Sequence, residues 1–162
     1  MEKRPFGRTG LQVSAIGFGC WEIGGGYGQI EETEFARAVG RALDLGINCF
    51  DTAEGYGFGA SERALGRALG GRRRDAIIVT KFGMGYRDKP KLRDASRARV
   101  MASIDQSLEN LGTDCVDVYL VDHRGGHRRD RCDLCPSRRQ PGPGPLGRGR
   151  LRRERCAAAS LP

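Results

Sequence analysis

Three side chains that can take part in proton transfer stand at or just after the ends of apolar segments. Asp51 lies near the end of INCFDTA, Tyr56 lies in the loop that follows, and Lys81 lies near the end of AIIVTKF. If both segments are parallel strands, their carboxyl ends meet at one edge of the sheet, where such folds place reactive groups. An ammonium beside a phenol favours the phenolate, and a carboxylate keeps the ammonium charged and in place. The three residues therefore indicate a proton-donor unit.

Each of these residues also has an ordinary structural explanation. Asp51 is typical of a residue that caps a turn, Tyr56 of a loop aromatic, and Lys81 of a solvated strand end. The hypothesis of catalysis depends on the three side chains coming together.

The elements that would position them alternate between strands and helices. Short apolar segments predict buried strands at 15–21, 47–52, 76–82 and 116–121, after a small hairpin within 6–14. Apolar residues at helical spacing predict helices over 33–46, 61–70 and 96–111, the second with Ser61 as its N-cap. This order predicts a parallel sheet covered by helices.

The turns between strands and helices argue for a barrel over a doubly wound sheet. The dinucleotide fingerprint G-x-G-x-x-G is absent from these turns in residues 1–121. The one formal match, at 142–147, contains two prolines and follows no predicted strand. We therefore expect an α/β fold, an incomplete (β/α)8 TIM barrel of about four β/α units.

The basic charge is concentrated at the C-terminal end. Of the net +8, residues 1–121 contribute +1, from 17 Lys and Arg against 16 Asp and Glu. Residues 122–162 contribute +7, from 11 Arg and no Lys against 4 acids, and contain no Val, Ile, Met, Phe, Tyr or Trp. Such a segment cannot bury enough apolar surface to offset its ordering entropy. We expect one domain over 1–121 and a disordered tail over 122–162.

The cysteines and the N-terminal residues indicate a reduced setting. Cys20, Cys49 and Cys115 fall in or beside apolar segments and are expected to pack as free thiols. Serine and glycine interrupt the apolar run after the first basic residues, so we expect no signal peptide, no membrane span and a cytoplasmic protein.

The motifs resemble those of the aldo/keto reductase family over residues 6–121. FDTAEGYG (50–57) followed by SERALGRAL (61–69) is similar to the family's Asp-Thr-Ala-x-x-Tyr-Gly loop and the helix after it. IIVTKFG resembles the family's lysine-bearing third strand, and GFGCWEIGG resembles its first strand and turn. LENLGTDCVDVYLV resembles the helix and strand that lead to the family's active-site histidine.

The resemblance implies a barrel that reversibly reduces a small aldehyde or ketone to an alcohol with NADPH, without a metal. Tyr56 would protonate the carbonyl oxygen as hydride arrives, Lys81 and Asp51 would tune it, and a histidine would orient the carbonyl. The residues implied near the nicotinamide are Gly19, Cys20, Trp21 and Asp51.

The resemblance changes at the end of the fourth predicted strand. Asp122 stands where the family has its histidine, and His123 follows one residue later. Two interpretations stay open: His123 takes the role if the strand end bulges, or its position is accidental. The family segments that bind the pyrophosphate and 2′-phosphate of NADPH have no counterpart in residues 122–162. We therefore expect the isolated chain to be poorly stable and inactive unless another chain completes the barrel.

Two hypotheses address residues 122–162. Their arginine, glycine, proline and alanine content resembles a GC-rich gene translated out of frame, which indicates a frameshift near codon 122. The alternative is a non-enzymatic basic binding protein. Arginine attracts nucleic acid through its phosphates, although without aromatic residues we expect no specific nucleic-acid partner. Residue types that bind zinc also occur, at a spacing shorter than usual, in His123, His127, Cys132 and Cys135.

The nucleotide sequence tests the frameshift directly. We expect one of the two other reading frames after codon 122 to encode the remaining strand–helix units of the barrel. Sequencing the gene through codons 115–130 and translating onward checks this. If neither frame encodes such units, the frameshift hypothesis is wrong.

Overall fold

The computed structural model describes residues 1–25, 28, 30–84, 94 and 96–122. The predictions for His123, for the zinc-binding residue types and for the tail lie outside these described residues. No helix in the described ranges is long and apolar enough to cross a membrane.

The described elements alternate as predicted. In chain order they are β1 (Lys3–Pro5), β2 (Gln12–Ser14), β3 (Phe18–Gly19), the 3-10 helix η1 (Glu22–Gly24), α1 (Glu32–Asp44), β4 (Cys49–Asp51), α2 (Ala60–Leu69), the 3-10 helix η2 (Gly70–Asp75), β5 (Ile77–Phe82), α3 (Arg97–Leu111) and β6 (Val118–Val121). A hairpin is present as β1 and β2, which pair antiparallel, but its first strand lies before the predicted range 6–14. Neither 3-10 helix was predicted.

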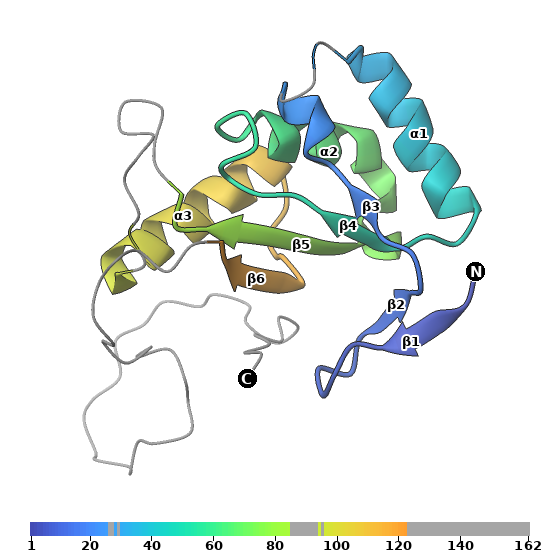
Figure 1. Cartoon of the computed structure of the whole chain (residues 1–162), viewed down its shortest axis with the longest axis horizontal. Coiled ribbons are helices and arrows are strands. Elements are labelled where there is room, and N and C mark those ends of the chain that lie inside the picture. Colours follow the sequence, from blue (N-terminus) through green and yellow to red (C-terminus); the bar gives the residue numbers. More distant parts are fainter. Residues whose placement is uncertain (26–27, 29, 85–93, 95, 123–162) are drawn as a thin grey trace.

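β3, β4, β5 and β6 form one parallel sheet in the order of the chain (Figure 1). Each strand is hydrogen-bonded to the next one along the sequence. A doubly wound sheet reverses its strand order at a switch point, whereas a barrel adds each strand beside the preceding one. The observed order confirms the predicted α/β fold, with four strands wound as in a (β/α)8 barrel.

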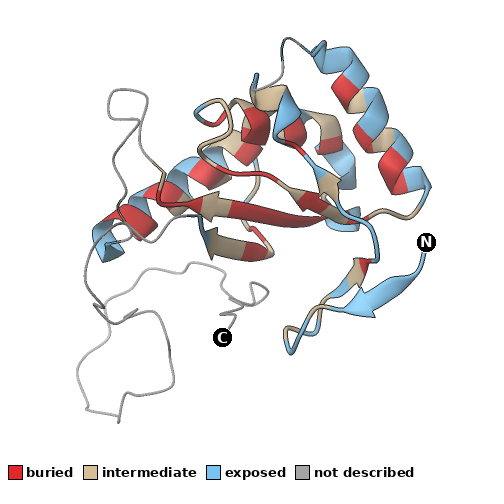
Figure 2. Ribbon diagram, viewed as in Figure 1, coloured by how far each residue is buried: buried red, intermediate tan, exposed pale blue. Residues whose placement is uncertain are grey.

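One apolar core lies between the sheet and the helices. Phe50 and Ile78 enter it from the sheet and are fully buried, and Val39, Leu65 and Leu111 enter it from α1, α2 and α3. The helices are buried along one side and exposed on the other, and β5 is buried along most of its length (Figure 2). The helical spacing seen in the sequence therefore marks the surfaces that cover the sheet.

The ends of α3 and α2 show where local sequence signals succeed and fail. Ser96 caps α3 by accepting a hydrogen bond from the backbone N–H of Arg99, and Gly112, with φ of 62°, follows its last residue, in agreement with the predicted range 96–111. The prediction that Ser61 caps α2 is wrong. The N-cap is Gly59, and Ser61 lies inside the helix, where its hydroxyl donates to the carbonyl oxygen of Cys20 (2.6 Å). A partner distant in sequence outcompetes the cap.

The close contact between α2 and α3 gives a test of the fold. A Cβ atom on Gly66 would lie 2.3 Å from the carbonyl oxygen of Leu111, so Gly66→Ala forces the helices apart. We expect a loss of about 1–3 kcal/mol in the free energy of unfolding, measured by urea titration. Gly40→Ala in α1 is the matched control, because its Cβ meets nothing within 4 Å. It should stabilise the chain by about 0.5–1 kcal/mol. Equal effects of the two variants would contradict the close α2–α3 contact.

Candidate active site

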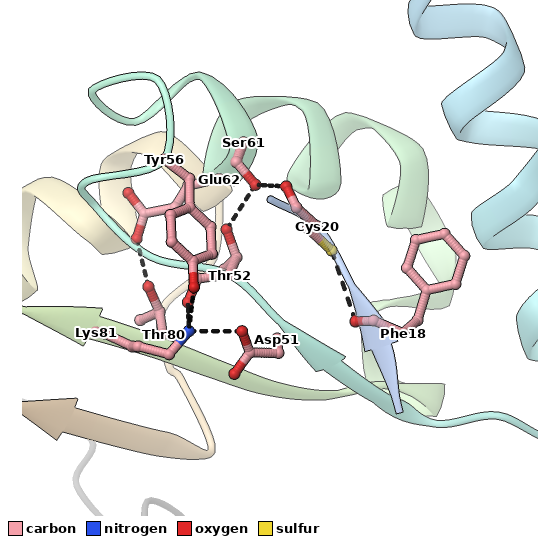
Figure 3. A network of polar contacts seen from close by, with 9 residues as sticks. All are labelled: Phe18, Cys20, Asp51, Thr52, Tyr56, Ser61, Glu62, Thr80 and Lys81. Atoms are coloured by element: carbon pink, nitrogen blue, oxygen red, sulfur yellow. Dashed lines mark hydrogen bonds and ion pairs between the residues drawn. The ribbon is translucent and has the colours of Figure 1, made fainter. Parts of the chain in front are cut away.

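The structure brings Asp51, Tyr56 and Lys81 together at the carboxyl edge of the sheet (Figure 3). The Lys81 ammonium donates to Oδ1 of Asp51 (2.5 Å), to the hydroxyl of Tyr56 (2.9 Å) and to the carbonyl oxygen of Thr52 (3.0 Å). An ammonium has three donors, and here each has an acceptor. Nζ also lies 4.7 Å from the centre of the Tyr56 ring. These contacts together fix the position of the Lys81 ammonium.

Strand register explains why these residues meet. Asp51 in β4 pairs with Val79 in β5, and Lys81 follows Val79 by two residues. Because side chains alternate along a strand, Asp51, Val79 and Lys81 project from the same face of the sheet. The loop after β4 then turns back, with the backbone N–H of Tyr56 donating to the carbonyl oxygen of Ala53 (3.1 Å). This turn brings the Tyr56 hydroxyl within hydrogen-bonding distance of the Lys81 ammonium.

The hydrogen bonds of Lys81 keep its ammonium charged. Burial alone works to lower the pKa of Lys81, since its side chain is only 13% exposed. Hydrogen bonds to Asp51 and Tyr56 and the charge of Asp51 outweigh burial, so the pKa of Lys81 is raised. At neutral pH the site therefore presents a fixed positive charge to the Tyr56 oxygen.

The residues expected near the nicotinamide end of a cofactor line the same edge. Gly19 in β3 pairs with Asp51, and a Cβ on Gly19 would meet nothing within 4 Å. The Trp21 ring lies 6.4 Å from the Tyr56 ring, centre to centre, and Trp21 is 45% exposed. There is therefore free space at Gly19 beside Asp51, and an exposed aromatic ring next to Tyr56.

Cys20 contributes differently from its neighbours. Its side chain is buried in the core beneath the helices, and its backbone N–H donates to the carbonyl oxygen of Asp51 (2.9 Å). Burial, with the nearby charges of Asp51 and Glu22, raises the pKa of the Cys20 thiol to about 12. The thiol therefore stays protonated at neutral pH, and only the main chain of Cys20 borders the site.

A buried polar network beneath the Tyr56 loop was not predicted. Ser61 joins the Thr52 hydroxyl (2.8 Å) to the carbonyl oxygen of Cys20. The fully buried carboxylate of Glu62 accepts from the Thr80 hydroxyl (2.7 Å) and from the side-chain amide of Asn110 (2.9 Å). The available signal was the pair of polar residues on the face of α2 that otherwise carries Ala and Leu.

The comparisons agree with these features. A family model described as "Aldo/keto reductase family" matches residues 15–130 and so includes the position of His123. The chain is 39% identical over 124 residues to the aldo-keto reductase YhdN of Bacillus subtilis, covering 75% of this chain and 38% of that protein. Among solved structures, the holo form of the aldo-keto reductase AKR11C1 from Bacillus halodurans is 40% identical with a TM-score of 0.66, covering 74% of this chain and 40% of that one.

A further solved structure, of an aldo-keto reductase from Klebsiella pneumoniae in complex with NADPH, is 29% identical with a TM-score of 0.59. It covers 72% of this chain and 37% of that one. The chain thus spans about two fifths of the length of these relatives.

The raised pKa of Lys81 predicts a specific dependence of stability on pH. A pKa that is higher in the folded state stabilises fully below the ordinary lysine value of ~10.4 and loses this effect as pH rises through the folded value. We therefore expect the difference in urea midpoint between the unmodified chain and Asp51→Asn to be constant from about pH 7 to 9 and to shrink above about 10.4.

Asp44→Asn is the matched control for this experiment. Asp44 pairs with Arg72 (2.8 Å), and an arginine does not deprotonate in this range. The difference caused by Asp44→Asn should therefore persist where the difference caused by Asp51→Asn shrinks. The same alkaline profile for both variants would contradict the role assigned to Lys81.

Proposed function

The chain belongs to the aldo/keto reductase family, and from this membership we propose that the whole protein reduces small aldehydes or ketones to alcohols with NADPH. The observation that carries the proposal is the triple contact of the Lys81 ammonium with Asp51, Thr52 and Tyr56. This contact supports a role for the Tyr56 phenol as an acid, next to the exposed ring of Trp21. The proposed setting is the cytoplasm, supported by Cys20 and Cys49 being free thiols.

Tyr56 is the proposed proton donor. Its oxygen accepts a hydrogen bond from Lys81, so its own proton is directed away from the ammonium and remains available to a carbonyl oxygen. When that proton leaves, the phenolate that forms lies 2.9 Å from a fixed positive charge. Asp51 holds that charge in place. Stabilisation of the developing negative charge lowers the barrier to carbonyl reduction.

The described residues fit the nicotinamide end of the cofactor. NADPH, when bound, supplies the hydride. Gly19 and Trp21 are the proposed contacts, because Gly19 leaves space for a flat ring and Trp21 exposes an aromatic face next to Tyr56. The proposal that the cofactor is NADPH is further supported by the Klebsiella pneumoniae relative, whose structure contains NADPH. We also propose that His123 orients the carbonyl group of the substrate.

We further propose that the isolated chain does not turn over substrate, and that residues 1–121 become active when a complete barrel surrounds them. The test is a chimera in which residues 1–121 are joined to the remaining part of the Bacillus subtilis relative. NADPH oxidation with a series of aldehydes is followed for the chimera, for the chimera with Tyr56→Phe and for the isolated chain.

We expect saturable activity in the chimera, a loss of about 10²–10⁴-fold in kcat with Tyr56→Phe, and none in the isolated chain. Full activity of the Tyr56→Phe chimera would contradict the role of Tyr56. Saturable NADPH oxidation by the isolated chain would show that it is active without the rest of the barrel. A folded but inactive chimera would count against the reductase function.

A further inference from the structure

Glu54 contacts the backbone of Lys81 and of Gly83, on both sides of Phe82 at the end of β5. It lies in the loop between β4 and α2, two residues before Tyr56. Its backbone N–H donates to the carbonyl oxygen of Lys81 (3.1 Å), and its Oε1 accepts from the backbone N–H of Gly83 (3.1 Å). One residue of the Tyr56 loop therefore holds the end of β5 at two points, with Lys81 at one of them.

Arg99 holds the Glu54 side chain in turn. Its guanidinium, in the first turn of α3, donates to Oε1 of Glu54 (2.7 Å) and to the carbonyl oxygen of Met84 (3.3 Å). The two side chains are only 7% and 10% exposed. Burial raises the pKa of Glu54, and the charge and hydrogen bonds of Arg99 oppose that rise. Burying a carboxylate is costly unless it is paired and hydrogen-bonded, and Arg99 supplies both the opposite charge and a hydrogen bond.

These contacts connect the two segments that meet at the active site. Tyr56 is carried by the loop after β4 and Lys81 by the end of β5, and the contact between phenol and ammonium spans the two. A lysine side chain is long and flexible, so its reach does not by itself determine where the Tyr56 hydroxyl sits relative to Nζ. The separation depends on how the loop is held against β5, and Glu54 makes both of the hydrogen bonds described above.

We propose that Glu54, anchored by Arg99, is a positioning residue that sets the contact between the Tyr56 hydroxyl and the Lys81 ammonium. The proposal rests on the proposed function for its catalytic meaning, but the contact itself is a property of the folded chain. Glu54 does not touch the reacting atoms. It acts through the backbone at Lys81 and at Gly83, which follows two residues later.

A second arginine–carboxylate pair provides a matched control. Asp117 accepts from the guanidinium of Arg73 (2.9 Å) and from the backbone N–H of Ile78 (2.8 Å). This pair also holds β5, but near the strand's beginning, whereas Glu54 holds the strand's end. Both side chains of the control pair are 20% exposed. Breaking either pair should lower the general stability of the chain. Only the loss of the Glu54 contacts is expected to change the pKa of Lys81.

The experiment measures the pKa of Lys81 by NMR in the full chain labelled with 13C,15N-lysine. The sequence contains four lysines, at 3, 81, 89 and 91, and Lys81→Met identifies the relevant signal. Three variants are compared with the unmodified chain. Glu54→Asp keeps the charge but shortens the side chain, Glu54→Gln keeps the shape but removes the charge, and Asp117→Asn is the control.

We expect the pKa of Lys81 to fall toward its ordinary value of ~10.4 in both Glu54 variants and to stay unchanged in Asp117→Asn. A fall in Glu54→Gln alone would show a direct charge effect and overturn the positioning role. No fall in either Glu54 variant, or an equal fall in the control, would overturn it as well. Circular dichroism at each pH confirms that the compared chains are folded. If Glu54→Gln does not fold, Glu54→Asp and Arg99→Lys, which both keep the charge, decide the result.

A second readout separates this proposal from the proposed function. In the chimera, Glu54→Asp should lower kcat by up to about 10²-fold with little change in KM, because the contact acts on the chemical step. If the unmodified chimera reduces no carbonyl compound, the proposed function fails, and the Lys81 titration still decides the role of Glu54. Unchanged kcat in an active chimera would overturn the positioning role.

Discussion

The arrangement at the carboxyl edge of the sheet depends on one largely buried ammonium that needs three acceptors. Lys81 finds them in a side chain of β4, in the main chain just after β4 and in the loop beyond. Taking a charge out of water is costly unless its hydrogen bonds are replaced. The ammonium therefore favours the arrangement in which Asp51 and Tyr56 converge on it, and the same arrangement is the one suited to proton donation.

The buried carboxylates of Glu54 and Glu62 and the hydroxyls of Thr52, Ser61 and Thr80 around this site each have a specified partner. Glu54 is neutralised by Arg99, and Ser61 joins α2 to the main chain of Cys20, just after β3. Glu62 is satisfied by neutral donors alone among its described contacts. Such contacts add little net stability but are expensive to break, since a buried group left without a partner loses its solvation as well. They restrict the loop and α2 to one arrangement, and that arrangement presents Tyr56.

Several elements were readable from the sequence because their signals are local. The helical spacing of apolar residues over 96–111 predicted α3, and the structure confirms it with a helix over Arg97–Leu111. The apolar AIIVTKF predicted β5. Ser61 was misread as a cap because local sequence shows a hydroxyl near a helix start but not the carbonyl of Cys20, which lies 41 residues away and receives its hydrogen bond.

The sequence by itself determined the alternation of strands and helices, the placement of Asp51, Tyr56 and Lys81 at strand ends or just after them, and the family resemblance, since all three follow from residue types and spacing along the chain. Only the tertiary structure decided that these residues touch, that the Cys20 thiol is turned into the core, and that Glu54 pairs with Arg99 across 45 residues. The physical reason is that strand register and burial arise when distant segments pack, and pairing and exposure belong to the packed chain.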